Sequence, residues 1–145
     1  MIVGFTGTRD GLTVLQKKAL LNQLNSMDIE QALHGDCIGA DYDFHRLVAS
    51  NIEYATISIY PPVNPTHRAN CHLIDLTTNV CVQVLKEGEY IARNHNIVDD
   101  CDMLIACPKD GVEVMRSGTW ATIRYAKKMK KAVCIIYSDG SIENK

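Results

Sequence analysis

The sequence has no long hydrophobic run and almost no excess of charge. No apolar stretch approaches the roughly 20 residues that a membrane-spanning helix needs, and none resembles a signal peptide. Its 15 basic and 17 acidic side chains leave a net charge of −2, so a broadly basic surface for nucleic acid is not expected. We therefore expect a cytoplasmic protein that makes no membrane contact, with nucleic acid a less favoured partner than a small molecule.

Paired cysteine motifs are also missing. The chain has six cysteines but no C-x-x-C pair, and several of them lie in apolar segments, where a free cysteine behaves as a small hydrophobic residue. Reduced thiols are therefore expected. His67, Cys71, His72 and Cys81 lie close together in the sequence, but their spacing matches no zinc pattern. We predict neither a metal site nor a cofactor.

Short apolar segments alternate with amphipathic ones along the whole chain. Apolar runs at 2–6, 31–34, 55–60, 103–107 and 133–136 predict strands, and the segments 13–27, 41–50, 90–101 and 118–130 predict helices. Strands that are apolar throughout are typical of a parallel sheet with helices on both faces. We predict one α/β domain over 1–145 with about five core strands. An irregular insertion at about 61–89, with a short strand at 80–85, is expected to act as a binding loop or lid, and the tail after Gly140 is polar.

The first helix carries a recognisable start signal. Thr13 followed by Gln16 three residues later is a capping-box pattern. Val14 and Leu15 are among the residues expected on the apolar face of this helix, which would pack against the sheet.

Glycine-containing turns follow the predicted strands at 7–11 and 35–39, and a third lies at 116–119 after a longer loop. In parallel sheets, ligands bind outside the carboxyl ends of the strands, so the three turns are expected to converge on one ligand. The dinucleotide fingerprint G-x-G-x-x-G is absent. The residues of these turns that we expect to contact the ligand are Gly7, Thr8, Arg9, Gly35, Asp36, Gly39, Arg116, Ser117, Gly118, Thr119 and Trp120.

The third turn has the residue types of a phosphate site. A helix start offers backbone N–H groups without intrahelical partners, and the helix dipole there favours negative charge. Gly118 allows a ligand close to the backbone, Ser117 and Thr119 add hydroxyls, and Arg116 adds a planar set of donors that suits phosphate. The alternative is an ordinary helix start with Ser or Thr as its cap.

Two other features leave alternatives open. Asp41 and His45 are four residues apart on one helix face, which suits either a catalytic pair or a structural hydrogen bond. Arg68, in the insertion, either reaches a ligand phosphate or is a solvated arginine.

Four segments together resemble the SLOG superfamily, which joins the DNA-processing protein A domain and the Lonely Guy phosphoribohydrolases. They are 4–9, 34–41 with His45, 93–98, and 116–122 with Ala126. The resemblance implies a Rossmann-like domain that binds a nucleotide or its phosphoribosyl part and forms homo-oligomers. It also adds Arg93 and Asn94 to the expected ligand contacts.

The chain departs from the phosphoribohydrolases at the residues that carry their chemistry. Those enzymes have a glutamate shortly after their Gly-Thr, where this chain has Ala121 and Thr122, and Asn94 replaces the lysine beside the family's arginine, Arg93. We therefore expect a binding or sensing module for a nucleotide-like molecule. The first alternative is an N-glycosidase on nucleoside monophosphates, with Asp36, Asp41 and Arg93 as candidate catalytic groups. The second is a module that binds single-stranded DNA, with Trp120 stacking on a base.

Overall fold

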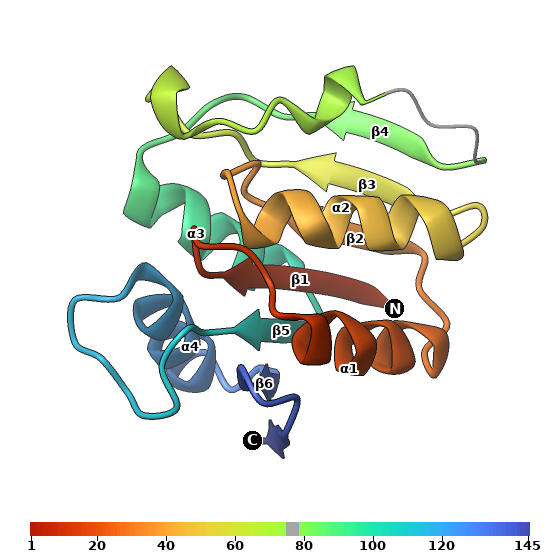
Figure 1. Cartoon of the computed structure of the whole chain (residues 1–145). Coiled ribbons are helices and arrows are strands. Elements are labelled where there is room, and N and C mark those ends of the chain that lie inside the picture. Colours follow the sequence, from red (N-terminus) through yellow and green to blue (C-terminus); the bar gives the residue numbers. More distant parts are fainter. Residues whose placement is uncertain (75–78) are drawn as a thin grey trace.

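The apolar runs form the centre of one sheet in the computed structural model, which describes residues 1–74 and 79–145 (Figure 1). Strands β1 to β6 are parallel, and β7 runs antiparallel to β6. The strand order is β4-β3-β2-β1-β5-β6-β7. The strands are β1 Ile2–Gly7, β2 Gln31–His34, β3 Thr56–Ile59, β4 Cys81–Val84, β5 Met103–Cys107, β6 Ala132–Ile136 and β7 Ile142–Asn144.

The predicted α/β class with a mostly parallel sheet is confirmed, but the sheet has seven strands rather than about five. The additional strands are the edge strands. Strand β4 corresponds to the short strand expected at 80–85, whereas β7 lies in the tail that the sequence marks only as polar. Since β7 has three residues and only its middle one, Glu143, is not exposed, it has no apolar run that could reveal it.

Helices cover both faces of the sheet (Figure 1). The first layer packs Leu20 and Phe44 against it, and the second packs Ile97 and Ile123. No helix among the described residues is long and apolar enough to cross a membrane. The first layer consists of α1 Val14–Asn25 and α2 Ala40–Asn51, and the second of α3 Tyr90–Asp100 and α4 Gly118–Lys128.

The described part of the 61–89 insertion packs against the second glycine turn. It contains two short 3-10 helices, η1 Pro65–His67 and η2 Cys71–Leu73, in addition to β4. The Ile38 amide donates to the carbonyl of His67 (3.0 Å), and the Ala69 amide donates to the carbonyl of Asp36 (2.7 Å). Residues 75–78 of the insertion lie outside the described residues.

Helix α1 is held to the sheet by a polar side chain. The capping box is present: the backbone N–H of Gln16 donates to Thr13 Oγ1, and the backbone N–H of Thr13 donates to Gln16 Oε1, both at 3.0 Å. The buried Gln16 Nε2 also donates to the carbonyls of Pro108 (3.0 Å) and Ile136 (3.1 Å). These two residues follow or end β5 and β6, so one side chain fixes the start of α1 to both strands.

Replacing Gln16 with Leu should therefore destabilise the fold. The change keeps a buried side chain of similar size but leaves two carbonyls without their donor, which costs about 2 kcal/mol or more in free energy of unfolding. Urea denaturation measures this loss. Gln23→Leu, on the same helix but only half-buried, is the matched control and should change the stability by less than about 0.5 kcal/mol. Equal losses in the two variants would contradict the role assigned to Gln16.

Candidate functional site

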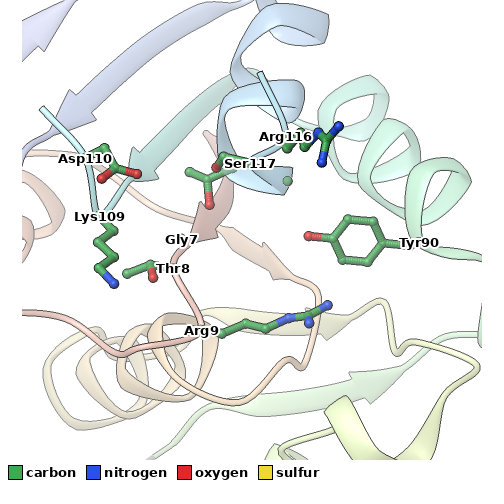
Figure 2. A pocket seen from close by; sticks show the side chains of 10 residues that line it. Gly7, Thr8, Arg9, Tyr90, Lys109, Asp110, Arg116 and Ser117 are labelled. Atoms are coloured by element: carbon green, nitrogen blue, oxygen red, sulfur yellow. The ribbon is translucent and has the colours of Figure 1, made fainter. Parts of the chain in front are cut away.

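The strand order reverses direction at β1. From β1 the chain adds β2, β3 and β4 on one side, and then returns to add β5 and β6 on the other. Ligands of open α/β sheets bind at this kind of switch point, outside the carboxyl ends of the strands. A cavity of about 400 Å³ opens there (Figure 2), and it is lined by Gly7, Thr8, Arg9, Tyr90, Lys109, Asp110, Arg116, Ser117, Gly118 and Thr119.

The start of α4 is capped, yet it still offers donors to the cavity. Ser117 Oγ accepts from the Trp120 amide (3.3 Å), and the Ser117 carbonyl accepts from the Ala121 amide (2.9 Å). Within the part of the chain that the structure describes, the amides of Gly118 and Thr119 have no acceptor. An ordinary cap and an open anion site, the two alternatives for this turn, are therefore both compatible with the same helix start.

Two acidic residues near the cavity, Glu113 and Asp10, pair with bases other than Arg116. Glu113 binds Arg124 (3.3 Å), and Asp10 binds Lys109 (2.8 Å). Among the described residues, neither Arg116 nor Arg9 forms an ion pair. The cavity therefore contains two guanidinium groups whose charge no carboxylate in direct contact neutralises.

Tyr90, the first residue of α3, covers the start of α4. A Cβ atom added to Gly118 would lie 1.9 Å from the Tyr90 hydroxyl. The Arg9 guanidinium lies 5.6 Å from the centre of the Tyr90 ring, and that of Arg93 lies 5.1 Å from it. A larger residue at position 118 would therefore displace Tyr90 before it could obstruct a ligand.

The second glycine turn closes on the protein itself. Gly39 has φ +90°, and a Cβ atom there would lie 2.3 Å from the carbonyl oxygen of Arg9. The Ala40 amide at the start of α2 donates to the carbonyl of Thr8 (3.0 Å). The start of α2 thus binds the first turn instead of a ligand. Of the three turns expected to converge, the first and third line the cavity, and the second packs beneath the first.

Asp36, predicted as a ligand contact and a catalytic candidate, is fully buried away from the cavity. Its Oδ2 accepts from Arg68 Nε (2.8 Å), and its Oδ1 accepts from the Cys71 amide (2.9 Å). Burial alone would raise the pKa of Asp36, but these hydrogen bonds hold the pKa below its usual value. Arg68, for which a ligand contact and a solvated position were the alternatives, instead forms an ion pair with Asp36. This ion pair holds the insertion on the second turn.

Arg93 is also buried, and its guanidinium contacts the backbone of the protein. Its Nη1 donates to the carbonyls of Gly35 and Tyr60, whereas its Nε has no partner among the described residues. Arg93 lines a small polar cavity of about 20 Å³, room for about one water molecule. This small cavity shares Gly7, Arg9 and Tyr90 with the larger one, and its other lining residues are Phe5, Thr6, Gly35, Cys37, Asp41, Asn94 and Ile97.

Asp41 is the buried carboxyl group of this small cavity. Its Oδ2 accepts from the Cys37 amide (3.0 Å). Burial raises the pKa of Asp41 to about 6, although the hydrogen bond from Cys37 and the charge of Arg93 act in the opposite direction. Asp41 therefore changes its charge close to neutral pH, directly beside the larger cavity.

Trp120 lies in the core and not in the cavity. Its side chain is 4% exposed and belongs to the apolar cluster between α4 and the sheet, together with Ile123 and Ala126. The ring cannot stack on a bound base unless α4 leaves the sheet. Trp120 was expected to contact the ligand, but its side chain lies on the inward stripe of α4 and is not among the residues that line the cavity.

Three lining residues were missed by the sequence reasoning: Tyr90, Lys109 and Asp110. Lys109 and Asp110 follow the end of β5 almost directly, so their place at the carboxyl edge could have been inferred from the strand order. Tyr90 carries no such signal, since only the packing of α3 beside α4 brings it to the cavity.

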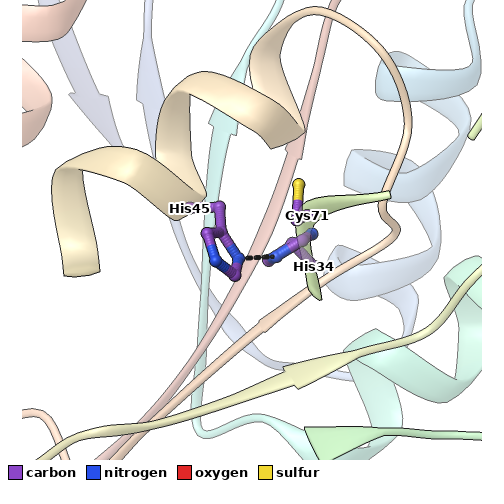
Figure 3. A group of neighbouring side chains, drawn as sticks. All are labelled: His34, His45 and Cys71. Carbon is purple, nitrogen blue, oxygen red and sulfur yellow. Dashed lines mark hydrogen bonds between the residues drawn. The ribbon is translucent and has the colours of Figure 1, made fainter. Parts of the chain in front are cut away.

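A second group of chemically versatile side chains is buried between α2 and the sheet (Figure 3). The potential ligand atoms of His34, His45 and Cys71 lie within 4.8 Å of one another. The Asp36 amide donates to His34 Nδ1 (3.0 Å), so the proton of this ring is on Nε2, which contacts His45 Nδ1 at 2.9 Å. A metal would need the lone pair of His34 Nε2. This arrangement is therefore a chain of hydrogen bonds and does not fit a metal ligand set.

Both rings of this chain are held neutral. Burial lowers the pKa of His34 to about 3 and that of His45 to about 4. His45 Nε2, the last donor of the chain, is buried without an acceptor among the described residues. Asp41 forms its hydrogen bond with Cys37 and His45 contacts His34, so Asp41 and His45 do not form the pair that their spacing suggested.

The buried histidines should make stability depend on pH. A histidine with a folded pKa of about 4 and an unfolded pKa near 6.5 stabilises the fold fully above pH 6.5 and loses this contribution as the pH falls toward 4. The unaltered protein should lose unfolding free energy as the pH falls from 7 to 5. The variant His45→Gln should lose about 2 kcal/mol less over the same range. Denaturant titrations at the two pH values measure it. The exposed His72→Gln is the control, and an unchanged pH dependence in His45→Gln would contradict the assignment.

A comparison of the sequence with protein-family models and with curated proteins finds no match. The resemblance to the SLOG superfamily thus stays a prediction.

Proposed function

We propose that this protein binds a nucleotide or another phosphoribosyl-containing small molecule in the cavity at the carboxyl ends of β1 and β5, as a binding or sensing module. The observation that carries the proposal is the pair of unneutralised guanidinium groups, Arg9 and Arg116, beside the open amides of Gly118 and Thr119. Guanidinium groups and backbone amides at a helix start are the donors that bind phosphate in proteins.

The size and location of the cavity support a small molecule. A volume of about 400 Å³ lies within the usual range of small-molecule pockets. The cavity occupies the switch point between β1 and β5, where α/β folds bind nucleotides. The resemblance of the turns at 4–9 and 116–122 to the SLOG superfamily points to the same class of ligand.

Arg116→Ala tests the proposal directly. Losing a charge-assisted hydrogen bond of about 2 kcal/mol should weaken the binding of a phosphate-bearing ligand roughly thirtyfold. The melting temperature should barely change, because Arg116 has no ion pair to lose within the described residues. Calorimetry with a panel of nucleoside monophosphates, cyclic nucleotides and ADP-ribose measures the affinity, and thermal unfolding measures the stability.

Arg46→Ala is the matched control, since this exposed arginine on α2 lines a different hollow. Its affinity should equal that of the unaltered protein. A lowered melting temperature with unchanged affinity in Arg116→Ala would show that the turn is scaffold. If no phosphate-bearing ligand binds at millimolar concentration, the proposed function is wrong.

One observation favours a second candidate, an N-glycosidase that acts on nucleoside monophosphates. Asp41 is a buried carboxyl group beside the cavity with a pKa of about 6. A carboxylate at this place could stabilise an oxocarbenium-like sugar, as carboxylates do in glycoside hydrolysis. Asp36 is less suited to that role because Arg68 and Cys71 occupy its oxygens.

Chromatographic detection of free base tests the glycosidase activity. The unaltered protein should release base from a nucleoside monophosphate, with a rate that rises as the pH increases through about 6 and Asp41 ionises. Asp41→Asn keeps an acceptor for the Cys37 amide and should abolish the release while the protein remains folded. Monophosphates that stay intact after prolonged incubation with the unaltered protein would rule this candidate out.

A further inference from the structure

Asp110 is a carboxylate in the cavity proposed to bind a phosphate, and it has no ion-pair partner among the described residues. It lines the cavity directly after β5, next to Lys109. The ammonium group of Lys109 contacts Asp10 instead, at 2.8 Å. Asp110 has neither an ion pair nor a side-chain hydrogen bond with any residue in the described ranges. Its two oxygens are thus available to a ligand.

The unpaired charges of the cavity are separated in space, since the Lys109 ammonium beside Asp110 is paired with Asp10. In Figure 2, Arg9, Tyr90 and Arg116 line one side, and Lys109 and Asp110 line the other. A phosphate that contacts the arginine side and the start of α4 is attracted there, whereas the Asp110 carboxylate repels it. An uncharged or positive part of the ligand therefore suits the place at Asp110, and hydrogen-bond donors suit it best, because an ionised carboxylate only accepts.

From this arrangement we infer that Asp110 binds the sugar hydroxyls of the ligand and makes the site selective for ribose over 2-deoxyribose. The inference rests on the proposed function, since it assumes that a sugar phosphate occupies the cavity. A ribose carries its phosphate and a vicinal pair of hydroxyls on one small ring, which suits a site with cations at one side and a carboxylate at the other. Acidic side chains bind ribose hydroxyls in this way in dinucleotide-binding folds.

The selectivity can be measured without knowledge of the base. The probes are ribose 5-phosphate, 2-deoxyribose 5-phosphate and inorganic phosphate, together with AMP, GMP, CMP and UMP and the 2′-deoxy form of each. Calorimetry is performed with the unaltered protein, Asp110→Ala and Asp110→Asn. Because a hydrogen bond to a charged acceptor is lost with the 2′-hydroxyl, the unaltered protein should bind the ribose member of a pair about tenfold more tightly.

In Asp110→Ala this ratio should fall to about one, while inorganic phosphate binds equally well or more tightly because a repelling charge is gone. Asp110→Asn should keep an intermediate ratio, since its amide oxygen still accepts. Glu53→Ala, an exposed carboxylate after α2, changes the net charge equally and should leave the ratio at about ten.

Several results would overturn the inference. One is equal binding of the ribose and deoxyribose forms by the unaltered protein. Another is a ratio that survives in Asp110→Ala, and a third is an affinity gain in Asp110→Ala for ribose and deoxyribose ligands alike. In each case phosphate binding persists and the proposed function stands. If none of the phosphates binds the unaltered protein, the proposed function fails and the selectivity fails with it.

Discussion

The contact between the first two glycine turns closes the start of α2 to a ligand and holds the turn after β1 in place. The Thr8 carbonyl accepts the Ala40 amide, and Gly39 lies against the backbone of Arg9 so closely that no side chain fits. This contact satisfies the start of α2 with the protein's own oxygen. It also fixes the turn after β1 in the position from which Arg9 reaches the cavity. At the start of α4, by contrast, the Gly118 and Thr119 amides have no acceptor among the described residues, and both residues line the cavity.

Local pairing of charges, and not the overall balance, decides which charges remain unpaired at this edge of the sheet. The chain as a whole has a net charge of −2, yet the acids close to the cavity are largely engaged with other bases. Asp36 binds Arg68 beneath the second turn. Glu113, on the loop before α4, binds Arg124 of that helix. A cavity with cationic character can therefore exist in an acidic protein, which composition alone would not indicate.

The sequence reveals the architecture better than it reveals the site. Continuous apolar runs and the pattern of Thr13 with Gln16 correctly predict the parallel strands and the start of α1. The apolar face expected for α1 includes Val14 and Leu15, yet both side chains are largely exposed. The polar Gln16 is buried instead, because its side-chain amide reaches two strand ends. Hydrophobic periodicity orients a helix only approximately, whereas a single pair of tertiary hydrogen bonds fixes it.

The candidate site shows the same limit. Residue types identify the turns after β1 and before α4, but whether a glycine turn is open or closed depends on what packs against it. Gly39 and Gly118 look alike in the sequence; one lies on the backbone of Arg9 and the other on the movable side chain of Tyr90. Similarly, Trp120 is close to the cavity in sequence, but its place on the inward stripe of α4 puts it in the core.

The pairing of β1 with β5 has a consequence for how the protein folds. Val3 is opposite Met103 in the sheet, so the two strands whose ends form the cavity are separated by most of the chain. Such distant pairing requires closure of a long loop, which slows folding. The cavity therefore forms only after the halves of the sheet have joined, and a ligand that binds there selects the fully assembled molecule. By mass action, such a ligand would add to the stability of the native state in proportion to the logarithm of its concentration once the site is saturated.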